Sequence, residues 1–81
     1  MNDPRLLVVG SYAAGLVMQT HRLPGPGETL LGHGFRTVHG GKGSNQAVQA
    51  ARLGIATTFL ACIGNDTYGD ACADLHRSEG V

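Results

Sequence analysis

The stretch that decides the fold reads HGGKGSNQAVQAARLG and spans residues 39–54. Its first half carries three glycines within four positions, which lets the backbone come very close to a ligand. In its second half Ala47, Val48 and Ala51 fall on one face of a helix, and Gly54 follows as a C-terminal residue of left-handed conformation. The stretch therefore predicts a glycine-rich loop that opens a helix, whose small apolar face can pack closely on a sheet.

Strand-like segments lie on both sides of this stretch. Leu6–Ser11 is a short apolar run typical of a strand buried on both faces, and Ile55–Ile63 is apolar and β-branched. Gly15–Leu23 and Glu28–Val38 are weaker strand candidates, which a Pro-Gly-Pro-Gly turn joins into a hairpin. Helices are predicted over Ser44–Leu53 and over Tyr68–Glu79, the second with Asp66 or Thr67 as its N-cap and Gly80 at its end.

The order strand, hairpin, glycine loop, helix, strand, helix is typical of an α/β domain with a parallel sheet. A chain of 81 residues is close to the size, about 70–80 residues, below which a disulfide or metal is usually needed for stability. Cys62 and Cys72 are the only cysteines, too few for a disulfide framework. The pattern also stops where a third strand of the sheet would begin. We therefore expect residues 1–81 to be one piece of a larger α/β domain, or a chain that needs a partner, with no second domain. An unusually small α/β protein is the alternative.

Composition disfavours several classes of partner. Six basic residues balance six acidic ones, whereas proteins that bind nucleic acid or acidic membranes normally carry a basic excess. No apolar run reaches the ~18 residues of a membrane span, and no charged start leads into a signal-peptide core. The four histidines show no metal-ligand spacing. We therefore expect a cytoplasmic protein without a metal site of its own.

The glycine loop carries the candidate chemistry. A helix that begins there directs free N–H groups and the positive end of its dipole at whatever binds. Lys42 adds a positive charge, and Asn45 adds both a donor and an acceptor, a combination that suits a polyhydroxylated ligand better than a bare phosphate. The Walker A pattern fails because Gly43 follows Lys42, and the dinucleotide pattern fails at Gln46. A glycine turn that simply begins a helix remains the alternative.

Several segments, taken in order, resemble the N-terminal part of the ribokinase family of sugar kinases, also called the PfkB carbohydrate kinases. The similarity is strongest where G-G-K-G-S-N-Q-A is followed by A-A-R-L-G, and it extends over nearly the whole chain. The matching segments are Val8–Ser11, Pro26–Thr29, Gly40–Ala47, Ala50–Gly54, and Gly64–Asp66 with Gly69.

This resemblance implies the N-terminal part of a ribokinase-like three-layer α/β/α fold, with a β-hairpin lid at about residues 15–38. It implies that Gly41, Lys42 and Asn45 hydrogen-bond the hydroxyl groups of a sugar, with Gly40 allowing close approach. The complete enzyme would transfer the γ-phosphoryl group of ATP, with Mg²⁺, to a sugar hydroxyl. In some members of the family the lids pair to form a homodimer.

The resemblance also has limits within these 81 residues. The family's catalytic Asp belongs to a G-A-G-D motif that this sequence lacks, and the residues for ATP and Mg²⁺ are likewise outside it, so the chain contains no catalytic residue and we expect it to be inactive alone. Ribokinases carry Asn and Asp where this chain has Ala13 and Gly15, which disfavours ribose as the sugar. The alternative function is a non-catalytic module that binds sugar or dimerises.

Overall fold

A computed structural model describes residues 3–81. Its elements confirm the predicted order of strand, hairpin, helix, strand and helix, with bounds that differ by a few residues. They are β1 (Arg5–Val9), β2 (Ala13–Gln19), β3 (His33–Gly40), α1 (Lys42–Arg52), β4 (Ala56–Leu60) and α2 (Thr67–Ser78).

The predicted parallel pair of strands is present. β1 and β4 pair in parallel, with Val8 opposite Phe59, and the chain between them contains the hairpin and then α1. Ala47 and Ala50 are buried on the small face of α1, which packs against β4 and β1, and Val8 of β1 is buried as well. The ring of Phe59 stacks on His76 of α2, so both helices cover the same face of this sheet. The opposite face, which carries Leu7 and other apolar side chains, is largely exposed.

The hairpin is offset from its predicted bounds of 15–23 and 28–38. β2 and β3 pair antiparallel, with Ala13 opposite Gly40, and the register shifts between Val17 and Gln19. β2 starts and ends earlier than expected, while β3 starts later and extends to Gly40. The physical reason is a long connection that a bidentate pair between Arg22 and Glu28 closes on itself.

A tight turn lies within this connection. The Glu28 N–H donates to the Gly25 carbonyl at 3.1 Å, so the turn lies one residue later than predicted. Pro26 occupies its second position, and Gly27 has a φ of 72°, the positive value that a type II turn requires of its third residue. The Gly25 N–H also donates to the Glu28 carboxylate at 2.9 Å. These bonds remove the residues around the turn from strand pairing.

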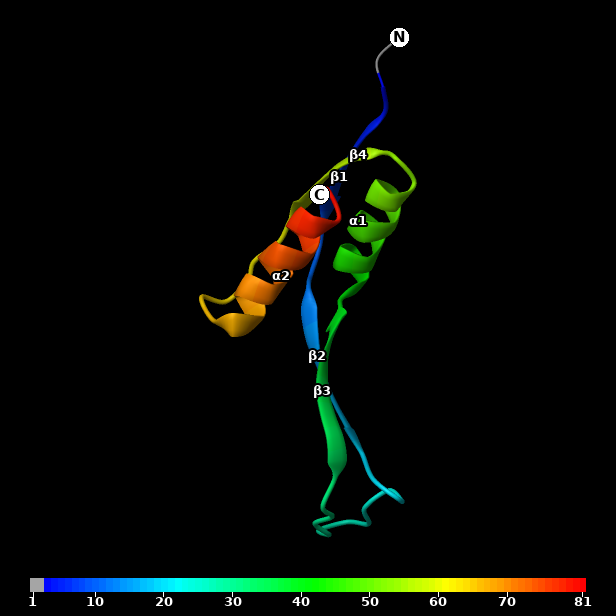
Figure 1. The fold of residues 1–81 in the computed structure, drawn as a ribbon, viewed down its shortest axis with the longest axis vertical. Coiled ribbons are helices and arrows are strands. Elements are labelled where there is room, and N and C mark those ends of the chain that lie inside the picture. Colours follow the sequence, from blue (N-terminus) through cyan, green and yellow to red (C-terminus); the bar gives the residue numbers. More distant parts are fainter. Residues whose placement is uncertain (1–2) are drawn as a thin grey trace.

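The hairpin projects from the end of β1 as a separate arm, away from the two helices (Figure 1). The described chain measures 60 × 25 × 20 Å, with a radius of gyration of 16.7 Å. A compact domain of this length would have a radius of about 12 Å. Leu16, Met18 and Phe35 on the arm are consequently exposed for more than half of their surface. Neither described helix has the length and apolar character needed to cross a membrane.

Both helices end in the way that the sequence predicts. After α1 the N–H of Gly54, whose φ is 90°, donates to the Ala51 carbonyl, and the Ile55 N–H donates to Ala50. This is a Schellman motif, and Gly80 ends α2 with the same pair of bonds. At the start of α2 the side chain of Asp66 accepts the Gly69 N–H at 2.9 Å, which confirms Asp66 as the N-cap.

An ion pair joins the C-terminal ends of the two helices. The guanidinium of Arg52 donates to both carboxylate oxygens of Glu79, with Nε to Oε2 at 2.8 Å. These hydrogen bonds from Arg52 lower the pKa of Glu79 below its usual value. Because the pKa is lower in the folded chain than in the unfolded chain, the pair stabilises the fold above the ordinary pKa of a glutamate. That stabilisation is lost as the pH falls through the folded value.

We therefore expect Arg52→Gln to make the free energy of unfolding depend less on pH in the acid range. The variant should be less stable than the parent chain at neutral pH, and the difference should shrink as the pH falls from 6 to 3. Urea unfolding followed by circular dichroism at each pH measures this. Arg77→Gln is the matched control, because Arg77 pairs with Asp74 where both side chains are more than three-quarters exposed. Identical pH profiles for the two variants would contradict the assignment.

Candidate functional site

The first turn of α1 rests directly on the backbone that leaves β1. A Cβ atom added to Gly43 would lie 2.9 Å from the Cα of Gly10 and 3.0 Å from the nitrogen of Ser11. The Ser44 N–H donates to the Ser11 carbonyl at 3.1 Å. Two backbone segments far apart in the sequence are thus in van der Waals contact, and this contact fixes where the glycine loop lies.

Gly41 is the N-cap of α1 and shows why the loop needs glycine. Its φ is 96°, a conformation that side-chain-bearing residues rarely adopt. An added Cβ would also lie 2.5 Å from the Ser11 carbonyl oxygen and 2.8 Å from the Cα of Tyr12. Gly40 precedes it as the last residue of β3, half-buried beside Ala13. The glycines therefore allow close approach to the chain's own backbone, whatever else binds there.

Lys42 and Asn45 are the first and fourth residues of α1, and both are exposed. Residues three apart on a helix are neighbours, so the structure brings these two side chains to one side of the first turn. The ion pairs among residues 3–81 use arginine as their cation, which leaves the Lys42 ammonium outside them. Asn45 borders a hollow of about 300 Å³ together with His39, whereas Lys42 is not among its lining residues.

The amides at the start of α1 are partly used within the chain. Ser44 donates to Ser11, and Asn45 donates to the Gly41 carbonyl at 2.9 Å. Within residues 3–81, the backbone N–H groups of Lys42 and Gly43 donate to no carbonyl in the loops and turns between helices and strands. The positive end of the helix dipole therefore keeps two amides, beside the Lys42 charge, that a ligand or water can use.

Tyr12, the residue before β2, contacts His39 of β3 at the base of the hairpin. The Tyr12 hydroxyl lies 2.6 Å from His39 Nδ1, and their ring centroids are 5.8 Å apart. Burial raises the pKa of Tyr12, and the charge of an ionised Cys72 raises it further, so the phenol stays protonated at neutral pH. His39 thus supports the loop through Tyr12.

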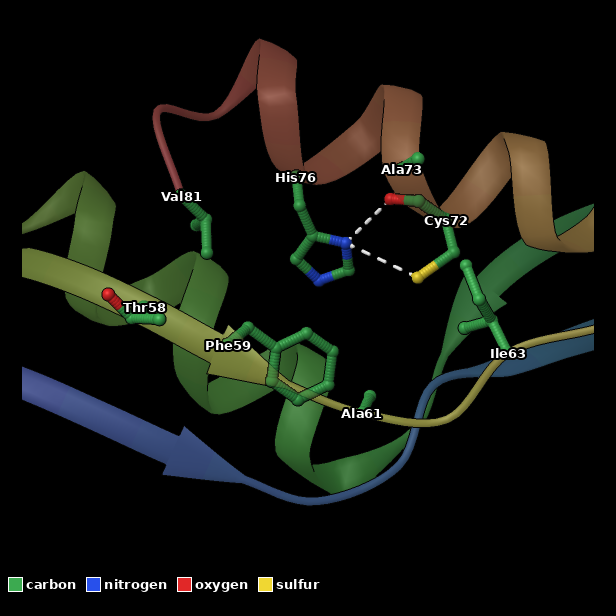
Figure 2. Close-up of a pocket in the computed structure, with 8 residues that line it drawn as sticks. All are labelled: Thr58, Phe59, Ala61, Ile63, Cys72, Ala73, His76 and Val81. Atoms are coloured by element: carbon green, nitrogen blue, oxygen red, sulfur yellow. Dashed lines mark hydrogen bonds between the residues drawn. The ribbon is translucent and has the colours of Figure 1, made fainter.

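A buried polar cluster of Ser44, Cys72 and His76 lies beneath the loop, and the sequence analysis did not predict that these residues meet. Ser44 Oγ lies 2.9 Å from His76 Nε2, although 32 residues separate them. On α2, His76 Nδ1 lies 2.6 Å from the Cys72 carbonyl oxygen and 3.5 Å from its sulfur. Figure 2 shows the two contacts between His76 and Cys72, with the ring of Phe59 beneath the imidazole. The i, i+4 spacing of Cys72 and His76 was the one sequence signal available for this cluster.

An apolar cavity of about 280 Å³ adjoins this cluster between β4 and α2 (Figure 2). Phe59, Ile63, Cys72 and His76 are among its lining residues, and none of the predicted site residues is. Burial raises the pKa of the Cys72 thiol, which is therefore neutral at physiological pH. A buried neutral thiol of this kind packs as a small apolar side chain.

Comparisons with known proteins give one consistent result. The family model described as pfkB family carbohydrate kinase matches residues 3–81. The ribokinase of Bacillus subtilis is 45% identical over 76 residues, which cover 94% of this chain and 26% of that protein. The ribokinase of Mus musculus is 51% identical over 65 residues, covering 80% of this chain and 20% of that protein.

Solved structures agree with the sequence matches. The chain superposes on ribokinase from Thermotoga maritima with a TM-score of 0.89 and 36% identity, covering 95% of this chain and 26% of that one. For Arabidopsis thaliana ribokinase, complexed with ribose and ATP, the TM-score is 0.84 with 38% identity, over 99% of this chain and 26% of that one. The 81 residues thus span about a quarter of the length of the relatives they match, and their fold corresponds to the N-terminal part.

The clash at Gly41 can be separated from its backbone strain. Gly41→Ala and Gly54→Ala both place alanine at a φ near 90°, but an added Cβ at Gly54 meets nothing within 4 Å. We expect Gly54→Ala to cost about 1 kcal/mol, and Gly41→Ala to cost about 1–3 kcal/mol more through overpacking. Chemical unfolding of the two variants measures the difference. Equal losses would mean that the approach to Ser11 and Tyr12 does not constrain the loop.

Proposed function

We propose, since this chain belongs to the pfkB family of carbohydrate kinases, that the first turn of α1 binds the hydroxyl groups of a sugar or related polyol that is phosphorylated from ATP. Similarity to ribokinases over 94% of the chain supports the reaction class. A cytoplasmic location goes with this proposal. Gly40, Gly41, Lys42 and Asn45 would form the sugar side of the site.

The observation that carries the proposal is the pairing of Lys42 and Asn45 on one exposed side of a helix N-terminus. A lysine ammonium offers three donors to hydroxyl oxygens, and an asparagine amide both donates and accepts. Vicinal hydroxyl groups each donate and accept, so they match this set better than a phosphate, which only accepts. Gly41, held against the Ser11 backbone, fixes the position of the turn from which both side chains project.

The described residues do not fit the metal of the reaction. Residues 3–81 contain no cluster of three or more His, Cys, Asp or Glu side chains that could hold an ion. We therefore assign no Mg²⁺-dependent step to these residues. We propose that residues outside this chain bind ATP and carry out the phosphoryl transfer. The role proposed for these 81 residues is to bind and orient the sugar, and we expect no phosphorylation by the chain alone.

The hairpin would act as a lid. It leaves the body of the chain at Gly40, next to the proposed site, and its other strand begins at Ala13 opposite that glycine. An arm hinged there could close over a bound sugar and exclude water from the reaction. Ala13 and Gly15 on this arm offer no polar side chain, so we propose a sugar or polyol other than ribose as the substrate.

A dimerising module is the second candidate, and the exposed side chains of the arm favour it. Leu16 and Met18 of β2 lie two residues apart, so they share one face of the hairpin. Phe35 of β3 lies on the same face. A second copy of the arm could cover these apolar groups, giving a homodimer through the lids. Sedimentation velocity over a range of chain concentrations, in the samples used for the titration below, separates this function from sugar binding alone.

We expect Lys42→Ala and Asn45→Ala each to weaken sugar binding by about tenfold or more. The first variant loses a hydrogen bond from a charged group, and the second loses an amide that both donates and accepts. Isothermal titration of the chain with a panel of sugars and polyols, ribose included, measures the affinity. Arg77→Ala is the control for loss of a positive charge, because the Arg77 side chain is more than three-quarters exposed and pairs with Asp74 on its own helix. Equal weakening by all three variants, or no binding of any sugar, would contradict the proposal.

A further inference from the structure

We propose that His76 is a positioning residue, which holds the side chain of Ser44 and thereby the first turn of α1. The inference rests on the proposed function, because the turn matters for activity only if Lys42 and Asn45 bind the substrate. His76 itself touches neither of these residues in any hydrogen bond of the described chain and lies on α2, beneath the loop.

Three segments of the chain meet at Ser44. Its side chain is 1% exposed, its N–H donates to Ser11 after β1, and its hydroxyl contacts His76 on α2. The residue lies between Gly43, which packs on Gly10, and Asn45. Any rotation of the first turn about the helix axis would therefore break the Ser44 bonds and displace Asn45 with them.

The bond between Ser44 and His76 has a defined direction. A carbonyl oxygen can only accept, so the contact of 2.6 Å between His76 Nδ1 and the Cys72 carbonyl places the ring proton on Nδ1. In its neutral form the ring then presents Nε2 as an acceptor, and the Ser44 hydroxyl donates to it. Both nitrogens are thus used, and the orientation of the imidazole is set from α2.

Aromatic contacts hold the imidazole from two further sides. Phe59 of β4 stacks on it with centroids 4.8 Å apart, and Tyr12 approaches edge-on at 6.1 Å. Tyr12 also hydrogen-bonds His39 at the base of the hairpin. His76 is consequently 7% exposed. It contacts Tyr12, which precedes the glycine loop in the sequence, and Phe59, which follows it. Figure 2 shows the ring held between Phe59 and the Cys72 carbonyl.

Nucleophilic chemistry does not explain this Ser–His pair. A serine that attacks a substrate must expose its oxygen, whereas the Ser44 side chain is almost completely buried. The histidine is oriented by a neutral carbonyl on its own helix, and the pair faces the protein interior. A role in positioning accounts for the burial, and it accounts for the use of all the polar atoms of both side chains.

The tautomer can be tested in the unmodified chain. Nitrogen-15 NMR of the histidine side chains, recorded at a pH high enough for the imidazoles to be neutral, should show the His76 proton on Nδ1 and Nε2 unprotonated. This readout needs no variant and does not depend on sugar binding. A proton on Nε2 would mean that Ser44 does not donate there, and the proposal would be overturned.

Residue-resolved amide hydrogen exchange tests the positioning. We expect Ser44→Ala and His76→Leu to speed exchange of the Ser44 and Asn45 amides by about tenfold, while the Ile55 amide at the other end of α1 changes less than about twofold. His76→Gln should restore slow exchange at position 44, because its side-chain oxygen can accept from the Ser44 hydroxyl. Equal acceleration at all three amides would show that His76 only packs.

Sugar titration of the same variants separates this inference from the proposed function. If both hold, Ser44→Ala and His76→Leu weaken binding severalfold although Lys42 and Asn45 are unchanged, and His76→Gln recovers most of the affinity. If the parent chain binds no sugar but the exchange pattern is found, the proposed function fails and the positioning of the turn stands. Weakened binding with unchanged exchange at Ser44 and Asn45 would overturn the positioning role.

Discussion

The backbones of Gly10 and Gly43 lie so close together that a side chain at Gly43 would meet the Gly10 Cα at 2.9 Å. This contact lets the start of α1 sit directly on the chain that leaves β1. The Ser44 N–H reaches the Ser11 carbonyl only because no Cβ intervenes. Further along the helix, Ala47 and Ala50 continue the same close packing onto the sheet. The positions of all the residues proposed to bind the sugar follow from this contact.

Two kinds of polar residue result from this arrangement, and they have different tasks. Lys42 and Asn45 are exposed at the helix start, where a ligand can reach them. Ser44, between them, points inward and shares a buried hydrogen bond with His76. A buried polar pair of this kind is costly unless both partners are satisfied, and here they are. The glycine segment therefore combines an exposed surface, for which we propose sugar binding, with an internal support on α2.

The sequence predicted what local chemistry decides. The caps at Asp66, Gly54 and Gly80 were correct because each depends on residues within one helical turn. The hairpin bounds were wrong because the pairing of Arg22 with Glu28 withdraws a long connection from the strands, and no periodicity reports it. The bond between Ser44 and His76 was missed because it joins residues that only the packing of α1 beside α2 brings together. The sugar-binding roles of Gly40, Gly41, Lys42 and Asn45 stay predictions.

The stability of Gly43→Ala tests most directly whether the close approach of Gly10 and Gly43 governs the site. Helix propensity alone favours alanine over glycine by about 1 kcal/mol, whereas overpacking costs about 1–3 kcal/mol. In Gly25→Ala, the control, the new Cβ would lie 4.0 Å from the nearest atom. We expect Gly43→Ala to lower the free energy of unfolding by up to about 2 kcal/mol, the overpacking less the gain in propensity, while the control changes little. A Gly43→Ala chain that is more stable than the parent would contradict the account.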